Sequence, residues 1–304
     1  MDKNVCECCS SKHISILGRH AGYNHLLCND CRFEYFMREG GMPSGSLYEK
    51  DGDYLDDLAV SGNYRDLLQW QHLIALKFIK SIKKSAPVIL DVGCFNGFFV
   101  KKLCDLGYEA HGIDFNRTAI EYGGSTYGLG NRIGVKDIDG LNAEKRKFDL
   151  ITLFDVIEHL ESPRQLLLSL RELLVEGGVL ILSTPNNRML WRPLLDYPPH
   201  HLSRYHPHTL ARFLSTNEFT IVGQFEQMNL FNLVRNFIGT LFRDKRSESL
   251  RGGRLGNRRW MNAARTSLNR IRPFVYAVLY PVDRLLHLLG LRYIGQVVIC
   301  EKIK

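Results

Sequence analysis

Two pairs of cysteines near the N-terminus have the spacing of a metal site. Each pair encloses two residues and eighteen residues separate the pairs, whose members are Cys6, Cys9, Cys28 and Cys31. Four thiolates complete the tetrahedron that zinc prefers, and a site with four protein ligands has no open position for chemistry. We therefore expect a structural zinc in a module spanning residues 1–40, with Cys8 as an alternative ligand to Cys9.

An acid and two glycines follow the apolar run 88–90: these are Asp91, Gly93 and Gly97. The run has the length and β-branching of a buried strand, and a helical pattern comes after the second glycine. Glycines in a strand–turn–helix unit let backbone N–H groups approach a ligand that a Cβ would exclude. Asp114 ends the next apolar segment, where a carboxylate can accept hydrogen bonds from ribose hydroxyls. These residues predict a site for a nucleotide-like ligand.

The elements that must position this site alternate between strands and helices. Apolar runs predict strands at 88–90, 109–115, 133–138, 148–155, 179–183, 219–225 and 296–300. Helical patterns are expected at 66–84, from Gly97 to Gly107, from Ser162 to Gly177 and at 209–216. The alternation predicts an α/β fold with a doubly wound, Rossmann-like, seven-stranded sheet, which binds ligands beyond the carboxyl ends of its strands.

Composition and patterning also predict how the chain is divided. We expect the zinc module at 1–40, a linker and N-terminal helices at 41–86, the core at 87–226, an α-helical insertion at 227–294 and the last strand of the core sheet at 295–304. Residues 1–12 lack the apolar core of a signal peptide, and no window offers about 20 uninterrupted apolar residues. The expected location is cytoplasmic, where eight cysteines stay reduced or bind metal.

The motifs together resemble class I S-adenosylmethionine-dependent methyltransferases. The resemblance covers roughly residues 64–225 and the last strand, and it rests on the segments 91–97, 112–114, 149–160 and 177–186. The nearest branch is similar to small-molecule enzymes of the ubiquinone-biosynthesis and deoxysugar types, some of which carry an N-terminal cysteine zinc domain. One departure is Phe95, which stands where the family usually has a glycine.

The resemblance also implies roles for single residues. It places Asp91, Gly93 and Gly97 around the amino-acid part of S-adenosylmethionine and Asp114 on its ribose. The remaining cofactor contacts that it implies are Asp137 and Ile138 at the adenine and Phe154 in the wall of the site.

Two adjacent histidines are the candidates for acid–base chemistry. A sulfonium methyl group is already activated, so the enzyme chiefly aligns a nucleophile with it, and a hydroxyl nucleophile gains from losing its proton to a base. His200 and His201 follow the fifth strand on the ligand side, and two prolines stiffen the approach to them. We favour His201, then His200, as the base. Alternatively, one of them bonds the backbone and the other is solvated.

A second constellation is formed by Asp155, Glu158 and His159. In a helix these positions share a face, and three such groups can hold a divalent ion together with waters. The spacing resembles metal-dependent O-methyltransferases, in which a downstream histidine assists, a part that His201 can play. The alternative is that Glu158 and His159 only brace the loop after the fourth strand.

The net charge of +8 is concentrated in one segment of the insertion. Residues 243–272 hold ten Lys/Arg and two Asp/Glu, and apolar stripes of helical spacing flank them. Amphipathic helices beside a basic segment suit an anionic membrane surface. The same segment suits RNA phosphates, and a lid or dimer contact with a solvated basic loop is the third interpretation.

The sequence therefore predicts a methyltransferase for a small molecule, with a hydroxyl of a sugar, a cell-envelope glycan or a lipid-linked intermediate as the acceptor. An RNA methyltransferase that uses residues 243–272 is the alternative enzyme. A cofactor-binding membrane adaptor without catalysis is the alternative outside enzymes. In each case a peripheral position on a membrane is compatible with a cytoplasmic protein.

Overall fold

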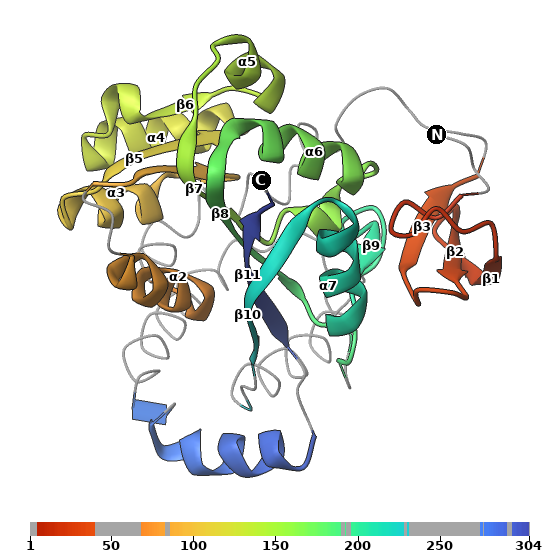
Figure 1. The fold of residues 1–304 in the computed structure, drawn as a ribbon. Coiled ribbons are helices and arrows are strands. Elements are labelled where there is room, and N and C mark those ends of the chain that lie inside the picture. Colours follow the sequence, from red (N-terminus) through yellow and green to blue (C-terminus); the bar gives the residue numbers. More distant parts are fainter. Residues whose placement is uncertain are drawn as a thin grey trace, which may run out of the picture.

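The computed structural model of the chain describes residues 5–39, 68–82, 86–189, 192, 196–227, 230, 274–275, 277–290 and 294–303. A large sheet with helices on both faces makes up the core, and a smaller sheet is formed mainly by the N-terminal residues (Figure 1). The large sheet contains all seven predicted strands. This confirms the α/β Rossmann-like fold class.

The seven strands of the large sheet lie in the order β10-β11-β8-β7-β4-β5-β6. Their bounds are β4 Val88–Val92, β5 Glu109–Asp114, β6 Ile133–Val135, β7 Phe148–Phe154, β8 Leu174–Pro185, β10 Phe219–Gln227 and β11 Gly295–Lys302. The pairs from β6 to β8 are parallel, whereas β11 runs antiparallel to both β8 and β10. The chain builds outward from β4 in one direction and then returns to place β7 on its other side. Ligands of doubly wound sheets bind where the order reverses in this way.

Alternate residues of the strands face opposite layers of helices, as the pleat requires. Ile89, Leu150 and Ile181 pack toward α2 (Trp70–Ser81), α3 (Phe98–Asp105) and α4 (Arg117–Tyr127). Their neighbours Leu90 and Ile151 pack toward α5 (Ile138–Ala143), α6 (Pro163–Leu173) and α7 (Pro207–Thr216). Strands that are apolar on both faces explain the unbroken hydrophobic runs in the sequence.

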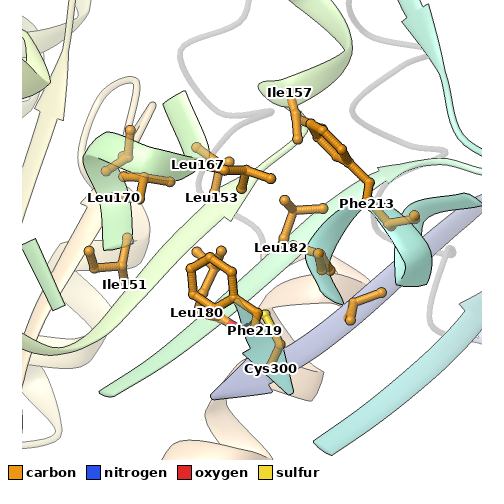
Figure 2. Close-up of a cluster of buried hydrophobic side chains, with 14 of the residues drawn as sticks. Ile151, Leu153, Ile157, Leu167, Leu170, Leu180, Leu182, Phe213, Phe219 and Cys300 are labelled. Atoms are coloured by element: carbon orange, nitrogen blue, oxygen red, sulfur yellow. Dashed lines mark hydrogen bonds between the residues drawn. The ribbon is translucent and has the colours of Figure 1, made fainter. Parts of the chain in front are cut away.

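Figure 2 shows the second of these layers around β7 and β8. Leu153 and Leu182 lie among side chains of α6 and α7, and Phe219 and Cys300 lie close together beside Leu180. The layer continues to Ile157, in the short 3₁₀ helix η3 (Ile157–His159) that follows β7. The core therefore reaches the carboxyl end of β7, where it supports the residues that follow.

The N-terminal module is an antiparallel sheet that a piece of the core completes. Its strands are β1 Ile14–His20, β2 Tyr23–Cys28 and β3 Glu34–Arg38, and β3 pairs with β9 (Ser203–Arg204). Helix α7 also holds the cysteine loops. The Thr209 hydroxyl donates to the carbonyl of Cys31 at 2.8 Å, and that of Thr216 donates to the carbonyl of Cys8 at 3.1 Å. The module is thus packed against the core through β9 and α7.

Several boundaries differ from those that the sequence predicts. The strand expected at 133–138 ends at Val135, because Asp137 caps α5 by accepting a hydrogen bond from the N–H of Gly140 at 2.8 Å. The helix expected to end at Gly177 ends at Leu173, and β8 begins at Leu174 and continues through a bulge. A left-handed conformation at Gly177, with φ of +69°, lets the strand pass this irregularity.

Most of the predicted insertion, including the whole basic segment 243–272, lies outside the described residues. Residues 277–290 are described, and 277–288 of them are helical (Figure 1). Their large apolar side chains are largely exposed, among them Val278, Leu285, Leu288 and Leu289. Among the residues that the structure describes, no helix combines the length and apolarity needed to cross a membrane.

Candidate active site and cysteine cluster

The turn after β4 has the conformation that glycines permit. Gly93 and Gly97 have φ of +74° and +72°, and a Cβ on Gly93 would lie 2.5 Å from Cγ2 of Val156. Phe95 also lies in the left-handed region, with φ of +53°. A glycine suits that backbone best, which gives a physical reason for the glycine that the resembling family has there.

Asp114 joins the glycine turn to the turn after β5. One carboxylate oxygen accepts a hydrogen bond from the N–H of Phe95, and the other accepts one from the N–H of Asn116, both at 2.8 Å. Asn116 in turn caps α4 by accepting from the N–H of Ala119 at 3.0 Å. The acid predicted to contact ribose therefore also fixes the two loops that surround the carboxyl ends of β4 and β5.

Asp91 is enclosed at the end of β4. Its Oδ1 accepts a hydrogen bond of 2.6 Å from the hydroxyl of Thr152 on β7. Burial raises the pKa of Asp91 to about 7, with a further contribution from the charge of Asp114 and an opposing one from the Thr152 hydrogen bond. A carboxyl group in this position favours a cationic neighbour, since a nearby positive charge stabilises its ionised form.

The other predicted cofactor residues lie near the same edge of the sheet. Phe154 ends β7, and its ring contacts those of Phe99 and His72 at centroid distances of 5.5 and 5.1 Å. Asp137 and Ile138 begin α5 after β6, with Asp137 exposed. The topology thus places all seven predicted cofactor residues at or just beyond the carboxyl ends of β4 to β7.

A second group of polar side chains lies after β7. One ligand atom from each of Glu158, His159 and His201 lies within 4.8 Å of those of the other two. Glu158 is 1% exposed, and one of its oxygens accepts a hydrogen bond of 3.0 Å from the hydroxyl of Thr184 on β8. Burial raises the pKa of Glu158 well above its ordinary value, and the nearby charge of Asp155 adds to this effect.

Both imidazoles of this group have Nδ1 engaged with an oxygen. His159 Nδ1 lies 2.7 Å from the carbonyl oxygen of His200, and His201 Nδ1 lies 3.0 Å from Oδ1 of Asp196. An Nδ1–H donated in this way places the ring's lone pair on Nε2, which can then act as an acceptor or as a metal ligand. Burial lowers the pKa of His159 to about 3, with further contributions from His201 and His200, so this ring is neutral.

Hydrogen bonds and ion pairs fix the segment 196–204 against η3 and within itself. The N–H of Leu202 donates to the carbonyl of Glu158 at 2.7 Å, which attaches the segment to η3. Asp196 accepts from His201 and pairs with two arginines: Arg192 Nη1 at 2.7 Å and Arg204 Nε at 3.2 Å from Oδ2. Burial alone would raise the pKa of Asp196. The His201 hydrogen bond and the two guanidinium groups outweigh it and hold that pKa below its usual range.

The constellation predicted from Asp155, Glu158 and His159 is arranged differently from a helical face. Residues 157–159 form a 3₁₀ helix, and Asp155 lies outside it with φ of +53°. Asp155 instead accepts hydrogen bonds from Gln71 and Ser183, at 2.9 and 2.8 Å. Of the two groups with metal-ligand geometry among the described residues, the one after β7 contains His201 and does not contain Asp155.

The four predicted cysteines of the module converge on one point. The sulfurs of Cys6 and Cys31 are 3.6 Å apart, as are those of Cys9 and Cys28, and all four lie within 4.8 Å of one another. A tetrahedron with Zn–S bonds of about 2.3 Å has edges of about 3.8 Å, so the cluster fits a zinc ion. Cys8 lies beside Cys6 and Cys31 but is not one of the four converging sulfurs, and its own sulfur lies 3.8 Å from the carbonyl oxygen of Thr209. The geometry favours Cys9 over Cys8 as the fourth ligand.

Comparison with known proteins decides the family. Residues 64–224, more than half of the chain, match the model of a family described as a methyltransferase domain. The chain belongs to this methyltransferase family. Curated relatives include the mitochondrial ubiquinone biosynthesis O-methyltransferase of Schizosaccharomyces pombe, with 30% identity over 145 residues that cover 45% of this chain and 53% of that protein. The corresponding enzyme of Roseobacter denitrificans is 28% identical over 159 residues, 48% of this chain and 62% of its own. The matches thus span a little more than half the length of these relatives.

Solved structures show the same fold as this chain. The phosphoethanolamine N-methyltransferase 2 of Haemonchus contortus, in complex with S-adenosyl-L-methionine, has a TM-score of 0.56 at 14% identity and covers 89% of this chain and 62% of its own. The [4+2]-cyclase SpnF has a TM-score of 0.53 at 16% identity, and the match covers 87% of this chain and 99% of the cyclase. Because a cyclase shares the fold, the architecture alone does not specify methyl transfer, and the site must carry the functional argument.

Some site residues had no signal in the sequence. Asp196 and Thr184 lie within predicted loops or strand ends, and neither belongs to a motif of fixed spacing. They join the site because segment 196–204 and the end of β8 both pack against η3. The apolar and charged pattern of the chain indicates neither contact.

Proposed function

We propose that the protein transfers the methyl group of S-adenosylmethionine to an oxygen atom of a small molecule. Membership of the methyltransferase family and the glycine turn at the end of β4 support the cofactor. Asp114 is held at the end of β5, where a carboxylate meets the ribose of nucleotide cofactors. The similarity to enzymes named O-methyltransferases supports oxygen as the acceptor atom.

The observation that carries the proposal is the group formed by Glu158, His159 and His201. Two imidazoles with engaged Nδ1 atoms and one buried carboxylate form a ligand set of the kind that divalent ions use in enzymes. A divalent ion held there would supply a Lewis acid for the acceptor hydroxyl. Glu158, His159 and His201 would hold that ion and so determine where an acceptor hydroxyl can bind.

His201 keeps a role in either version of this chemistry. With a metal it is a ligand through Nε2, and without one the same lone pair takes the proton of the hydroxyl, which is the role expected from the sequence. His200 contributes its backbone carbonyl to His159. We propose a structural zinc in the Cys6–Cys9–Cys28–Cys31 cluster, separate from this chemistry.

The acceptor we propose is a hydroxyl of a sugar, a cell-envelope glycan or a lipid-linked intermediate. The exposed apolar side chains of residues 277–290 support a contact with an anionic membrane surface, where such acceptors are found. Co-sedimentation with vesicles tests this contact. The wild-type protein should sediment with vesicles containing phosphatidylglycerol, and a Leu285→Gln/Leu288→Gln/Leu289→Gln variant should stay in solution.

The enzyme itself is tested by incubating the purified protein and labelled S-adenosylmethionine with a cell extract, and by identifying the labelled product by mass. Activity should fall on treatment with EDTA and return with Mg²⁺ or Mn²⁺. Glu158→Gln should reduce turnover by at least 100-fold while cofactor binding, measured by calorimetry, is retained. Glu161→Gln, at an exposed carboxylate three residues further on, is the matched control. Activity that resists chelation and survives Glu158→Gln would exclude the metal and leave His201 as a base.

A further inference from the structure

Asp196 makes an unusual set of contacts for a loop carboxylate. It is 1% exposed, although it belongs to none of the named strands and helices. Its two oxygens have different partners: Oδ1 faces His201 Nδ1, and Oδ2 faces the guanidinium groups of Arg192 and Arg204. Burying a carboxylate costs desolvation free energy unless such partners compensate it. We therefore ask what Asp196 does for the groups that it contacts.

The two arginines are themselves fixed. Arg204 Nη2 donates to the backbone carbonyl of Asp196 at 2.7 Å, and its guanidinium lies over the rings of Phe36 and Tyr197 at 4.8 and 4.5 Å. Arg192 Nη2 donates to the carbonyl of Asn187 at 2.8 Å. Both cations are thus held by other parts of the fold, and together they determine where Oδ1 of Asp196 can lie.

The consequence falls on His201. A neutral imidazole has two tautomers, and a carboxylate that accepts from Nδ1 selects the form in which Nε2 carries no proton. The ring of His201 also lies almost perpendicular to that of His159, with centroids 4.7 Å apart and an interplanar angle of 76°. Tautomer and ring plane together decide whether His201 joins Glu158 and His159 as a ligand set.

We propose that Asp196 is a positioning residue for His201: its carboxylate, held by Arg192 and Arg204, fixes the Nδ1–H tautomer and the ring orientation that bring Nε2 to Glu158 and His159. The proposal rests on the proposed function for the use made of Nε2. The tautomer itself can be measured independently of any activity.

The test uses the full-length protein labelled with ¹⁵N-histidine, with His201→Gln to assign the His201 signals. In the wild-type protein at neutral pH, long-range ¹H–¹⁵N spectra should show His201 as the Nδ1–H tautomer. Asp196→Asn removes the charge and can present an amide N–H to the ring, so His201 should shift to the Nε2–H form or to a mixture. Asp30→Asn is the matched control, because Asp30 faces His13 Nδ1 at 3.3 Å in an exposed Asp–His pair of the module. Its substitution should leave the His201 signals unchanged.

Mn²⁺ titration followed by electron paramagnetic resonance is the second readout. Asp196→Asn should weaken Mn²⁺ binding by about 10- to 100-fold, the usual cost of losing a carboxylate that orients a histidine ligand, and Asp30→Asn should not. If the wild-type protein binds no Mn²⁺ but Asp196→Asn changes the His201 tautomer, the metal proposal fails and the positioning role stands. An Nε2–H tautomer of His201 in the wild-type protein would overturn the positioning role. This measurement needs no variant, so the proposal can be tested even if Asp196→Asn does not fold. An unchanged tautomer together with unchanged Mn²⁺ affinity in a folded Asp196→Asn would overturn it as well.

Discussion

At the scale of single residues, the carboxyl group of Asp91 connects the glycine turn with the pH dependence of stability. Burial raises its pKa to about 7, whereas an aspartate in the unfolded chain has a pKa of about 3.9. Between about pH 4 and pH 7 the folded protein therefore retains a proton that the unfolded chain has lost. The free energy of unfolding falls as the pH rises through this window, because the folded state binds more protons there. Above about pH 7, Asp91 is ionised in both states, and the loss in the free energy of unfolding stays at its full value.

We accordingly predict that Asp91→Asn stabilises the cofactor-free protein at pH 8 and has much less effect near pH 4.5. Asparagine cannot ionise, and its oxygen can still accept the hydrogen bond from Thr152. Three pKa units set an upper limit of about 4 kcal/mol on the gain, since one unit corresponds to about 1.4 kcal/mol. Urea unfolding at a series of pH values measures it, with Asp105→Asn at an exposed, lysine-paired carboxylate as control. A difference between Asp91→Asn and wild type that stays constant from pH 5 to pH 8 would contradict the shifted pKa.

At the scale of elements, helix α4 is packed against the glycine turn so closely that one of its positions must be glycine. A Cβ on Gly123 would lie 2.0 Å from the backbone oxygen of Asn96, which belongs to the turn between β4 and α3. Nothing lies within 4 Å of the corresponding position on Gly124, the next residue of the same helix. A methyl group therefore fits at position 124 but not at position 123.

Gly123→Ala should destabilise the protein by about 2 kcal/mol or more and weaken the binding of S-adenosylmethionine, because α4 or the turn must move. Gly124→Ala should stabilise it by up to about 1 kcal/mol, since alanine is the better helix former at an open position. Urea midpoints and calorimetric titration with the cofactor measure both effects. Equal effects of the two substitutions would show that the helix and the turn are less closely packed than this contact requires.

The same helix marks the limit of what the sequence reveals. Strands with apolar side chains on both faces appear in the sequence as unbroken apolar runs. The seven strands, and the residues at the ends of β4 and β5, could therefore be predicted. Helix α4 has no clear apolar stripe, because it packs through small residues such as Ala119 and Gly123, and the sequence pattern did not indicate it. The spacing in the sequence indicated Glu158 and His159 as possible metal ligands. That His201, and not Asp155, completes the group, and that Asp196 contacts His201, depends on how the loops pack. Hydrophobic periodicity carries no information about such packing.

At the scale of the whole molecule, the cysteine module and the site after β7 share one piece of chain. Strand β9 pairs with β3 of the module, and it directly follows the segment that contains His201. Phe33 of the module packs against Tyr205 and Phe213 of the core, with centroids 5.2 and 6.2 Å away. Glu34 on β3 accepts a hydrogen bond from Asn187 at 2.8 Å. Loss of the module's fold would therefore remove support from the segment that holds His201.

The neighbouring residues Cys8 and Cys9 allow this coupling to be tested. Cys9→Ser removes a member of the four-sulfur cluster, whereas Cys8→Ser alters a buried side chain that faces Thr209. Cys9→Ser should lower the zinc content, measured by mass spectrometry of the purified protein, and Cys8→Ser should leave one zinc per chain. Methyl transfer should fall at least tenfold in Cys9→Ser, because β9 loses its partner strand when the module loosens. Binding of S-adenosylmethionine should persist, since the glycine turn and Asp114 belong to β4 and β5 in the other half of the sheet. Full activity in a zinc-free Cys9→Ser protein would mean that the core holds the His201 segment without help from the module, and the two sites would then be independent.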